Sequence, residues 1–393
     1  MTSRLPGFFQ KTPLERRTLI EEGAGVLHAD VLSIDSADQM VENAIGVFGM
    51  PLAVAPNFVV DGKPVLVPMV IEEPSVVAAS SRMAKLVAMS GGFKTQVDEP
   101  IMAGQIQLVG VADIERACRE IACAKQKLIN QANGVLSSLK ARGGGCVDIR
   151  TRVLPARKPE DEAFLVVELL VHCCDAMGAN LINTTVEVLS KSVADLVKGR
   201  AVFRILSNLC DLRIARASCE LPFRALATDE SGDNGAEIAR NMVIGYEFAM
   251  RDPYRATTHN KGIMNGVDAV LLATGNDWRA AEAGAHAYAA RKGQYESLTH
   301  FELDESRSVL SCSIELPLAV GVVGGATTAH PQVVSNLKML GEFGVSSKKL
   351  ASVVASVGLA QNLGALWALA GVGIQRGHMA LHKRKREIYA DRV

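Results

Sequence analysis

The segment Met102-Ala103-Gly104-Gln105-Ile106-Gln107-Leu108-Val109-Gly110 is the first strand-like element in the middle of the chain, and a long helical pattern follows it. A glycine run then breaks the chain before two more strands, a second helix and a further strand. The predicted elements are a helix at 112–139, strands at 146–153 and 164–173, a helix at 178–197, and strands at 202–206 and 212–221. The order β-α-β-β-α-β is that of a ferredoxin-like split unit.

We therefore expect an α/β (α+β) fold with two domains, a number that suits a chain of 393 residues. The small ferredoxin-like domain is expected at 100–211. It would be inserted into a large helical and sheet domain formed by 1–99 and 212–372.

The second helix of the small domain opens with Asp175-Ala176-Met177-Gly178-Ala179-Asn180. Exposed amides at a helix start favour a phosphate, and a glycine lets a ligand approach closely. An ordinary helix cap with small residues in its first turn explains the segment equally well. No GxGxxG motif follows a strand, so a Rossmann domain is not indicated.

The balance of charges gives no indication of a strongly acidic or strongly basic partner. Lys+Arg and Asp+Glu both number 42, which gives a net charge of +0 and no pull toward nucleic acid or acidic lipid. The eight cysteines show no CxxC spacing, so free thiols in a reducing cytoplasm are the simplest interpretation. The apolar stretch within the first ten residues is too short for a signal peptide.

An uncharged stretch from Leu350 to Ile374 is long enough to span a bilayer. Alanine, glycine, serine, Gln361 and Asn362 dilute its apolar character, and no second such stretch occurs. We expect a helix buried on most sides inside the large domain, in a protein that does not enter a membrane.

A lysine among small and amide residues marks the final third, in Thr257-Thr258-His259-Asn260-Lys261-Gly262-Ile263-Met264-Asn265-Gly266. We expect a glycine-flanked loop there, then an apolar strand over 267–273, then Gly275-Asn276-Asp277-Trp278. A lysine so held can polarise a carbonyl, and a nearby carboxylate would keep it charged. A surface lysine in a glycine turn is the alternative.

Three further segments carry chemistry or local structure. Glu73, between a strand at 65–71 and a helix beginning near Pro74, is expected to cap that helix, although it could also serve a ligand. Ser36 resembles the start of a capping box, with a helix continuing through Phe48. His378 and His382 are four residues apart but have no evident third ligand, so we expect a proton donor on a flap and no metal.

Together these stretches resemble the 3-hydroxy-3-methylglutaryl-coenzyme A reductases, in particular their class II, bacterial-type branch. The resemblance covers almost the whole chain. It rests on Glu42-Asn43-Ala44-Ile45-Gly46, Glu72-Glu73-Pro74-Ser75, Asp175-Ala176-Met177-Gly178-Ala179-Asn180, His259-Asn260-Lys261-Gly262-Ile263-Met264-Asn265-Gly266, Gly275-Asn276-Asp277-Trp278-Arg279 and Gly377-His378-Met379.

The resemblance implies reduction of a thioester to an alcohol by two hydride transfers, interconverting HMG-CoA with mevalonate and coenzyme A. Lys261 would polarise the thioester carbonyl and stabilise the oxyanion, and Asp277 would hold and tune Lys261. Glu73 would supply a proton at the aldehyde stage. His378 would protonate the departing coenzyme A thiolate.

The resemblance also implies binding residues and a homodimer with its site between subunits. The substrate would contact Ser75, Arg255 and Asn265, and the nicotinamide cofactor would contact Asp175, Met177, Gly178, Asn180 and Asn208. The uncharged run from Leu350 and the helix after Pro74 offer more apolar face than one subunit covers. Catalytically silent binding of coenzyme A esters, or thioester hydrolysis, are the rival functions.

Two departures from the family pattern matter. Class II enzymes that favour NAD carry an acid for the ribose hydroxyls, and here Leu136 stands at the matching position, with Lys140 and Arg142 downstream. We therefore expect weak discrimination between NAD and NADP, with a slight preference for NAD. Residues 373–393 are expected to form a shortened C-terminal flap.

Overall fold

The computed structural model describes residues 2–24, 32–228, 232 and 234–371. Its strands are β1 Leu52–Val60, β2 Lys63–Val70, β3 Lys94–Val97, β4 Ile101–Val109, β5 Gly145–Leu154, β6 Phe164–His172, β7 Arg200–Leu206, β8 Ile214–Pro222, β9 Thr299–Asp304 and β10 Val309–Pro317. The α-helices are α1 Pro13–Ala24, α2 Ile34–Met40, α3 Val76–Met89, α4 Ile114–Val135, α5 Ser137–Lys140, α6 Ala179–Val197, α7 Phe223–Leu226, α8 Gly235–Arg251, α9 Pro253–Ala273, α10 Trp278–Ala289, α11 Ala326–Ala329, α12 Pro331–Met339 and α13 Ser347–Ala370. Short 3₁₀ helices cover Phe8–Gln10 and Gly341–Gly344.

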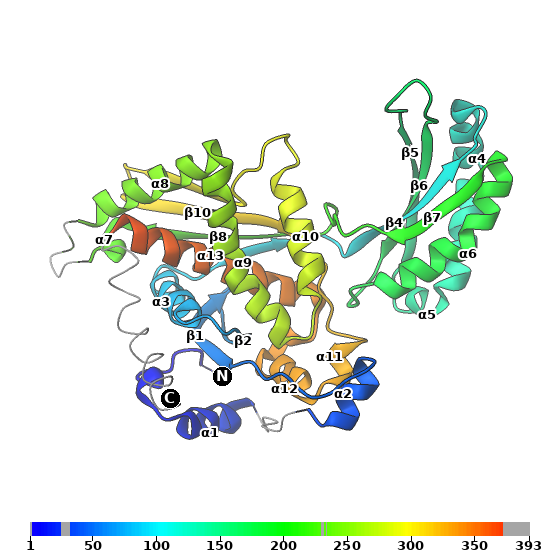
Figure 1. Cartoon of the computed structure of the whole chain (residues 1–393). Helices are drawn as coiled ribbons and strands as arrows, with labels where there is room; N and C mark the ends of the chain where they lie inside the picture. The colour runs from blue at the N-terminus through cyan, green and yellow to red at the C-terminus, as the bar shows by residue number, and fades with distance from the viewer. Residues whose placement is uncertain (1, 25–31, 229–231, 233, 372–393) are drawn as a thin grey trace.

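Helix α13 is the centre of the larger part of the molecule (Figure 1). It packs against α9, α3, α8 and strand β8, and residues from Leu350 to Leu363 are buried along its whole circumference. A helix that is apolar on every face is stable only when other elements surround it. In the described part of the chain it is the one helix apolar enough to cross a membrane, and 78% of its most apolar window is buried inside the protein. The prediction of a buried core helix is confirmed.

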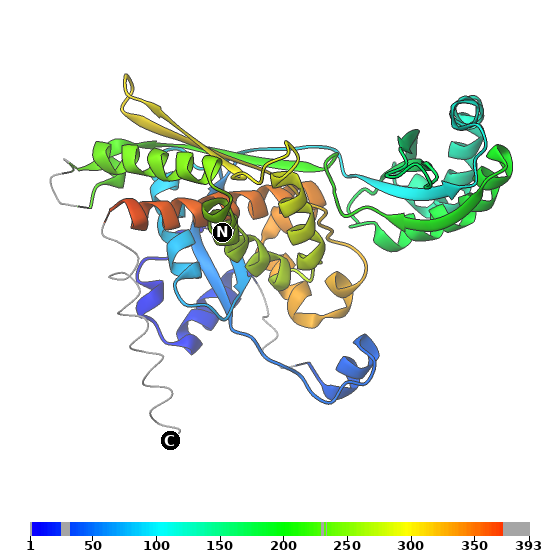
Figure 2. The same cartoon turned by 45° about the horizontal axis from the view of Figure 1, so that its top comes forward.

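Two sheets accompany α13 in this larger part. The strands β3-β8-β10-β9 form an antiparallel sheet, and β1 and β2 form an antiparallel hairpin that packs against α3 and α9. One continuous hydrophobic core joins both sheets to α3, α8, α9, α10 and α13. Figure 2 shows α1 beside the hairpin and α2 on an extended arm that leaves the body.

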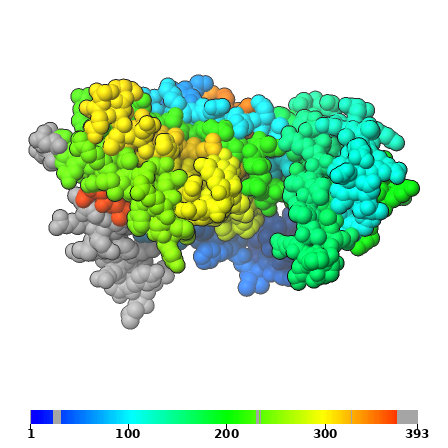
Figure 3. All heavy atoms as spheres, turned by 90° about the horizontal axis from the view of Figure 1, so that it is seen from above, coloured from blue at the N-terminus to red at the C-terminus, as the bar shows by residue number. Residues whose placement is uncertain are grey.

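A third sheet, β5-β6-β4-β7, forms the small lobe together with α4, α5 and α6. All its neighbouring strands are antiparallel, and the order of its elements along the chain is β-α-β-β-α-β once α4 and α5 are taken together. This lobe has its own hydrophobic core and stands to one side of the larger part (Figure 3). The predicted mixed α/β class is confirmed.

The predicted loop and strand around Lys261 are wrong, because residues 253–273 form the single helix α9. Pro253 occupies the first turn, and Asp252 caps it by accepting hydrogen bonds from two backbone amides. Gly266 serves a helix crossing rather than a turn. A side chain there would lie 3.1 Å from the Cγ1 atom of Val357 on α13, so its absence lets the two helices approach closely.

The helix predicted after Ser36 is also wrong. Helix α2 is shorter and earlier, with Ser33 as its N-cap, and it ends at Met40. The arm that follows, residues 41–50, has no regular structure. Ile45 is 101% exposed and Phe48 is 91% exposed, so the apolar spacing that suggested a helix face is not buried within this chain.

Candidate active site

Lys261 and Glu73 form an ion pair, with 3.1 Å between Nζ and Oε2. Lys261 lies on the outer side of α9, since Ile263, Met264 and Val267 of the same helix enter the core. Its side chain is 61% exposed and that of Glu73 is 41% exposed. An ammonium and a carboxylate in contact at a solvent-accessible position can both reach a bound substrate.

Glu73 does not cap α3, contrary to expectation. The N-cap of α3 is Ser75, in the left-handed conformation with φ 78°, and its side chain accepts no capping hydrogen bond. A residue other than glycine rarely adopts this conformation, and such strain is often found at functional sites. The turn between β2 and α3 thus presents Glu73 to Lys261 across a separation of 188 residues in the chain.

Asp277 is engaged elsewhere. Its carboxylate caps α10 by accepting from the backbone amide of Ala280 at 3.1 Å, and it pairs with Arg279 at 3.2 Å. Among the described residues, its hydrogen bonds and ion pairs do not include Lys261. The neighbouring Asn276 accepts a hydrogen bond from the amide of Gly321 at 2.7 Å.

Two residues of the lysine motif point inward. His259 is 1% exposed, and its Nε2 lies 2.8 Å from Thr299 Oγ1 and 2.9 Å from Ser297 Oγ. Asn260 donates to the carbonyl of Glu296 and accepts from the amide of Leu298. Burial, reinforced by the nearby Arg255 guanidinium, lowers the pKa of His259 to about 3, so this imidazole is neutral. Both residues fix α9 against the loop before β9.

The other residues matched to substrate binding also lie on α9. Asn265 follows Lys261 by four residues and therefore shares its helix face. Arg255 is half-buried on the first turn, and burial lowers its pKa. The helix thus places Asn265 on the same face as Lys261, whereas Arg255 lies toward His259.

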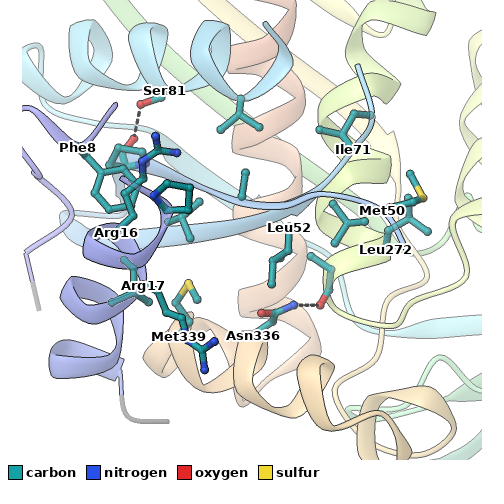
Figure 4. A pocket seen from close by; sticks show the side chains of 18 of the residues that line it. Phe8, Arg16, Arg17, Met50, Leu52, Ile71, Ser81, Leu272, Asn336 and Met339 are labelled. Carbon is teal, nitrogen blue, oxygen red and sulfur yellow. Dashed lines mark hydrogen bonds between the residues drawn. The ribbon is translucent and has the colours of Figure 1, made fainter. Parts of the chain in front are cut away.

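A cavity of about 1260 Å³ opens beside Glu73. It is bounded by α1, the arm, the β1–β2 hairpin, α3, the end of α9 and α12, as Figure 4 shows for part of its lining. Glu73, Pro74 and Ser75 line it together with the basic side chains Arg16 and Lys85. Its size is above the usual range for a small-ligand site and suits an extended molecule.

The segment matched to the cofactor is anchored between the two parts of the molecule. The Asp175 carboxylate accepts from the backbone amide of Ser347, at the start of α13, at 2.8 Å. Its carbonyl accepts from the amide of Val322 at 2.9 Å. Gly178 has φ 105°, and a side chain there would lie 2.4 Å from Cys173 Sγ, so glycine is required.

Sequence reasoning missed Arg213, which holds this segment by its backbone carbonyls. Its guanidinium is 3% exposed and donates to the carbonyls of Ala176 at 3.2 Å, Met177 at 3.3 Å and Val320. Burial lowers its pKa, and its hydrogen-bond partners are neutral backbone carbonyls. The available signal was a charged residue between Leu212 and Ile214 where a strand was predicted.

Asn180 and Asn208 are both exposed. Asn180 lies in the first turn of α6, and its carbonyl accepts from the hydroxyl of Thr184. The carbonyl of Asn208 accepts from Cys210 Sγ, and Cys210 and Cys173 are both close enough to Arg213 to influence its pKa. The loop before β8 therefore meets the Asp175 segment around Arg213.

Leu136 stands at the position that the resemblance matches to the ribose-binding acid, and its side chain points into the protein. It is 1% exposed and belongs to the core of the small lobe. Lys140 and Arg142 are exposed at the end of α5 and in the turn after it. The carbonyl of Arg142 lies 3.6 Å from Cys174 Sγ, so this turn borders the Asp175 segment.

His378 and the flap at 373–393 lie outside the described residues, as does His382. Among the residues that are described, no group of three or more His, Cys, Asp or Glu side chains could hold a metal ion. The absence of a metal site remains a prediction.

Comparison with known proteins identifies the family. Residues 12–383 match the family model of hydroxymethylglutaryl-coenzyme A reductase. The chain is 44% identical over 397 residues to 3-hydroxy-3-methylglutaryl-coenzyme A reductase of Archaeoglobus fulgidus, covering 99% of this chain and 88% of the relative. It is 31% identical over 383 residues to a probable reductase of Borreliella burgdorferi, covering 96% and 85%.

A solved structure agrees with these sequence relatives. The class II 3-hydroxy-3-methylglutaryl-CoA reductase of Streptococcus pneumoniae bound to NADPH superposes with a TM-score of 0.89 at 40% identity, covering 93% of this chain and 99% of that one. The predicted resemblance is therefore confirmed. The chain belongs to the hydroxymethylglutaryl-coenzyme A reductase family, whose members are NAD(P)-dependent oxidoreductases.

Proposed function

We propose that this hydroxymethylglutaryl-CoA reductase uses the Lys261–Glu73 pair as its reacting groups and the adjoining cavity for the coenzyme A thioester. The observation that carries the proposal is the 3.1 Å contact of Lys261 Nζ with Glu73 Oε2, at the point where Glu73 also lines the cavity of about 1260 Å³. A thioester lying in the cavity would bring its carbonyl to both groups.

In this mechanism the Lys261 ammonium binds the thioester carbonyl oxygen and stabilises the oxyanion that forms on hydride addition. Glu73 gives a proton to the carbonyl oxygen at the aldehyde stage. Asn265, one turn along α9, and Ser75, at the start of α3, orient the carboxylate and hydroxyl end of the substrate, with Arg255. His378 protonates the coenzyme A thiolate.

Asp277 acts on Lys261 only after a change of partner. Its carboxylate is bonded to the Ala280 amide and to Arg279. A side-chain rotation that releases Arg279 would free the carboxylate for a new partner. We assign Asp277 the role of keeping Lys261 charged while Glu73 is protonated and neutral.

The side chains that line the cavity suit the coenzyme A part of the thioester substrate. The lining is largely apolar, as the pantetheine chain requires, and Arg16 and Lys85 supply cations for phosphates. The Arg16 side chain also donates to the carbonyl of Lys11, which holds α1 against the preceding turn.

The residues at the start of α6 fit a nicotinamide dinucleotide. Gly178 is the N-cap and has no side chain to accept from the first-turn amides, so these amides are available to a pyrophosphate. The bound cofactor supplies hydride to the substrate carbonyl. Asp175, Met177, Asn180 and Asn208 then define its position, with Asp175 acting through its bond to Ser347.

We propose weak discrimination between NAD and NADP. Leu136 is buried in the core of the small lobe, so the choice between the two cofactors falls to exposed side chains nearby. The exposed Lys140 and Arg142 lie beside the Asp175 segment and can attract one. The Streptococcus pneumoniae relative was solved with NADPH, which supports acceptance of the phosphorylated form here; the slight preference for NAD stays a prediction.

A homodimer in the cytoplasm completes the proposal. The arm from 41 to 50 carries the family's Glu42–Gly46 motif, yet Ile45 and Phe48 are almost fully exposed. Covering them with a second copy would bury apolar surface and bring the arm's polar residues to the partner's site. Analytical sedimentation tests this, and a fully active monomer at assay concentration would contradict it.

We assign the substrate to residues 1–99 and 212–372 and the cofactor to 100–211. Support comes from the separate hydrophobic core of the small lobe and from the membership of β3 and β8, on either side of it, in the same larger sheet. Only the segments 98–100 and 207–213 connect the two parts. Independent refolding of a 100–211 fragment would test the boundaries.

One assay separates the reductase from its rivals. The protein is mixed with mevalonate, coenzyme A and either NAD or NADP, and the nicotinamide absorbance is followed. A rise with either nucleotide supports the reductase. No change with both, while the protein binds coenzyme A esters or hydrolyses them, would favour silent binding or thioester hydrolysis.

A further inference from the structure

A cysteine, a histidine and a glutamate form a hydrogen-bonded row outside the reacting pair. Cys174 Sγ lies 3.7 Å from Nδ1 of His172, and Nε2 of His172 lies 3.2 Å from Oε2 of Glu99. Among the described residues, Cys174 is the one cysteine with a histidine nitrogen at hydrogen-bonding distance from its sulfur. A nucleophile next to a base that a third group orients is the arrangement of nucleophilic catalysis.

The glutamate fixes which imidazole nitrogen can accept a proton. Glu99 also binds the Lys348 ammonium at 2.7 Å, and its hydrogen bonds from Lys348 and then from His172 lower its pKa. A charged carboxylate at Nε2 favours the tautomer with hydrogen on that nitrogen. The lone pair of Nδ1 then faces Cys174, whose backbone amide also lies near it at 3.4 Å.

Several parts of the fold hold the thiol at this nitrogen. Cys174 has φ 53°, and its carbonyl accepts from the Ser347 hydroxyl at 3.0 Å. Gly144 leaves room for the sulfur, since a side chain there would come within 2.8 Å of it. The carbonyl of Arg142 is a second acceptor for the thiol hydrogen, at 3.6 Å.

We propose that Cys174 is a site of thiol–disulfide exchange with small-molecule disulfides, with His172 as its base and Glu99 as the positioning residue. Nδ1 of His172 takes the thiol proton while Cys174 Sγ attacks one sulfur of the disulfide. A new disulfide bond forms to Cys174, the original one breaks, and the released thiolate takes up the proton. Cys174 is oxidised and the small molecule is reduced to one thiol, so no further oxidant is needed.

The histidine matters because the thiol is otherwise unreactive. Burial raises the pKa of Cys174, and the nearby Arg142 opposes this only in part. A thiol with a raised pKa holds little thiolate at neutral pH, and thiolate is the attacking species. Cys123 on α4 is more exposed but has no histidine at its sulfur among the described residues, which makes it the natural internal comparison.

The position of Cys174 gives the modification a consequence, which rests on the proposed cofactor site. Cys174 directly precedes Asp175, and the same residue of α13, Ser347, bonds to both. A bulky group on the sulfur would displace the segment that precedes α6. Disulfide exchange would therefore weaken dinucleotide binding, and bound NADP would slow the exchange.

The test incubates the full chain with glutathione disulfide and follows each cysteine by peptide mass spectrometry. We expect Cys174 to react about tenfold faster than Cys123 or more. The His172→Gln substitution, which keeps a donor toward Glu99 but removes the base, should slow Cys174 about tenfold or more. Glu99→Gln should slow it less. Cys123 should react at the wild-type rate in both variants, which reports that the fold is retained.

Two results would overturn the proposal. One is a Cys174 rate no greater than that of Cys123 in the wild type. The other is an unchanged Cys174 rate in His172→Gln. If His172→Gln alters the Cys123 rate, His172→Asn is used in its place and the same criteria apply. Because mass reports the exchange without turnover, an inactive reductase would not affect this result, and failure of NADP to protect Cys174 would overturn only the link to the cofactor.

Discussion

The lysine motif on α9 and the aspartate motif before α6 use their polar residues in opposite ways. On α9, Lys261 projects outward to Glu73, while His259 and Asn260 are buried and bonded to the loop before β9. Before α6, the one charged side chain, Asp175, is bonded to the amide of Ser347. There the parts that remain available to a ligand are backbone amides of the first helical turn.

This difference shows that a motif's residues do not share one role. The helix of the first motif is rigid, and its two faces separate the chemistry from the packing. The second motif is an irregular segment, and irregular backbone needs partners for its own polar groups. The buried Arg213 supplies partners for the carbonyls of Ala176 and Met177, and the Asp175 carboxylate ties the segment to the amide of Ser347 on α13. Both charged side chains therefore bind backbone groups.

The largest effect is expected at the exposed end of the first motif. Lys261→Ala should lower kcat about a hundredfold to a thousandfold, because the oxyanion loses its cation. The free energy of unfolding should change by less than about 0.5 kcal/mol, since the side chain is 61% exposed. Steady-state kinetics and urea unfolding measure both. Lys338→Ala, an exposed lysine on α12, is the control, and turnover of Lys261→Ala at the control's level would contradict the assignment.

The second motif should show the reverse pattern. Arg213→Met removes the donor to three carbonyls, and each buried carbonyl left without a partner costs about 1–3 kcal/mol. We expect the free energy of unfolding to fall by about 3 kcal/mol or more. In Arg213→Lys, which keeps the charge, KM for the nicotinamide should rise more than KM for HMG-CoA. Equal effects on both KM values would mean that Arg213 stabilises the fold without positioning the cofactor segment.

The buried face of the first motif makes stability depend on pH. The pKa of His259 is about 3 in the folded protein and near 6.5 when unfolded. Below about pH 6.5 the unfolded chain binds a proton that the folded chain does not, so stability falls as pH falls. Between pH 6.5 and 5 this contributes about 2 kcal/mol. Urea unfolding of the wild type and of His259→Gln measures the difference, and parallel pH dependences would contradict it.

The fold class and the buried helix α13 were predictable from the sequence because each depends on local pattern. Strand and helix periodicity gave the order of the small lobe, and an uncharged run of about 24 residues gave α13. The helix α9 was missed because Gly262 and Gly266 resemble turn residues. Gly266 is explained by the close approach of α13, a contact between distant segments that no local pattern contains, whereas Gly262 faces open space.

Side-chain partners were less predictable than elements. Glu73 and Lys261 are 188 residues apart, so only the family resemblance suggested that they meet. Arg213, Cys174 and His172 were not singled out, because their partners are backbone carbonyls or residues on other elements. Leu136 was matched to the ribose-binding position by its place in a motif, whereas it directly follows α4 and its side chain lies in the core of the small lobe.

The smallest expected effect concerns recognition of the cofactor's 2′-phosphate by side chains beside the second motif. If its backbone amides bind the pyrophosphate, the choice between NAD and NADP falls to side chains at the border of the segment, and Lys140 and Arg142 are exposed there. An exposed ion pair contributes about 0.2–1 kcal/mol. Arg142→Ala should therefore lower kcat/KM for NADP about twofold to fivefold and leave that for NAD nearly unchanged. Lys140→Ala should act in the same direction, and the effect of the double variant on the free energy of NADP binding should be close to the sum of the two single effects.

Arg204→Ala, which replaces an exposed arginine on β7 of the same lobe, is the matched control. Because screening weakens exposed pairs, added salt should narrow the difference between NADP and NAD in the wild type but not in the double variant. An unchanged ratio of NADP to NAD in all three variants would show that neither side chain reads the phosphate.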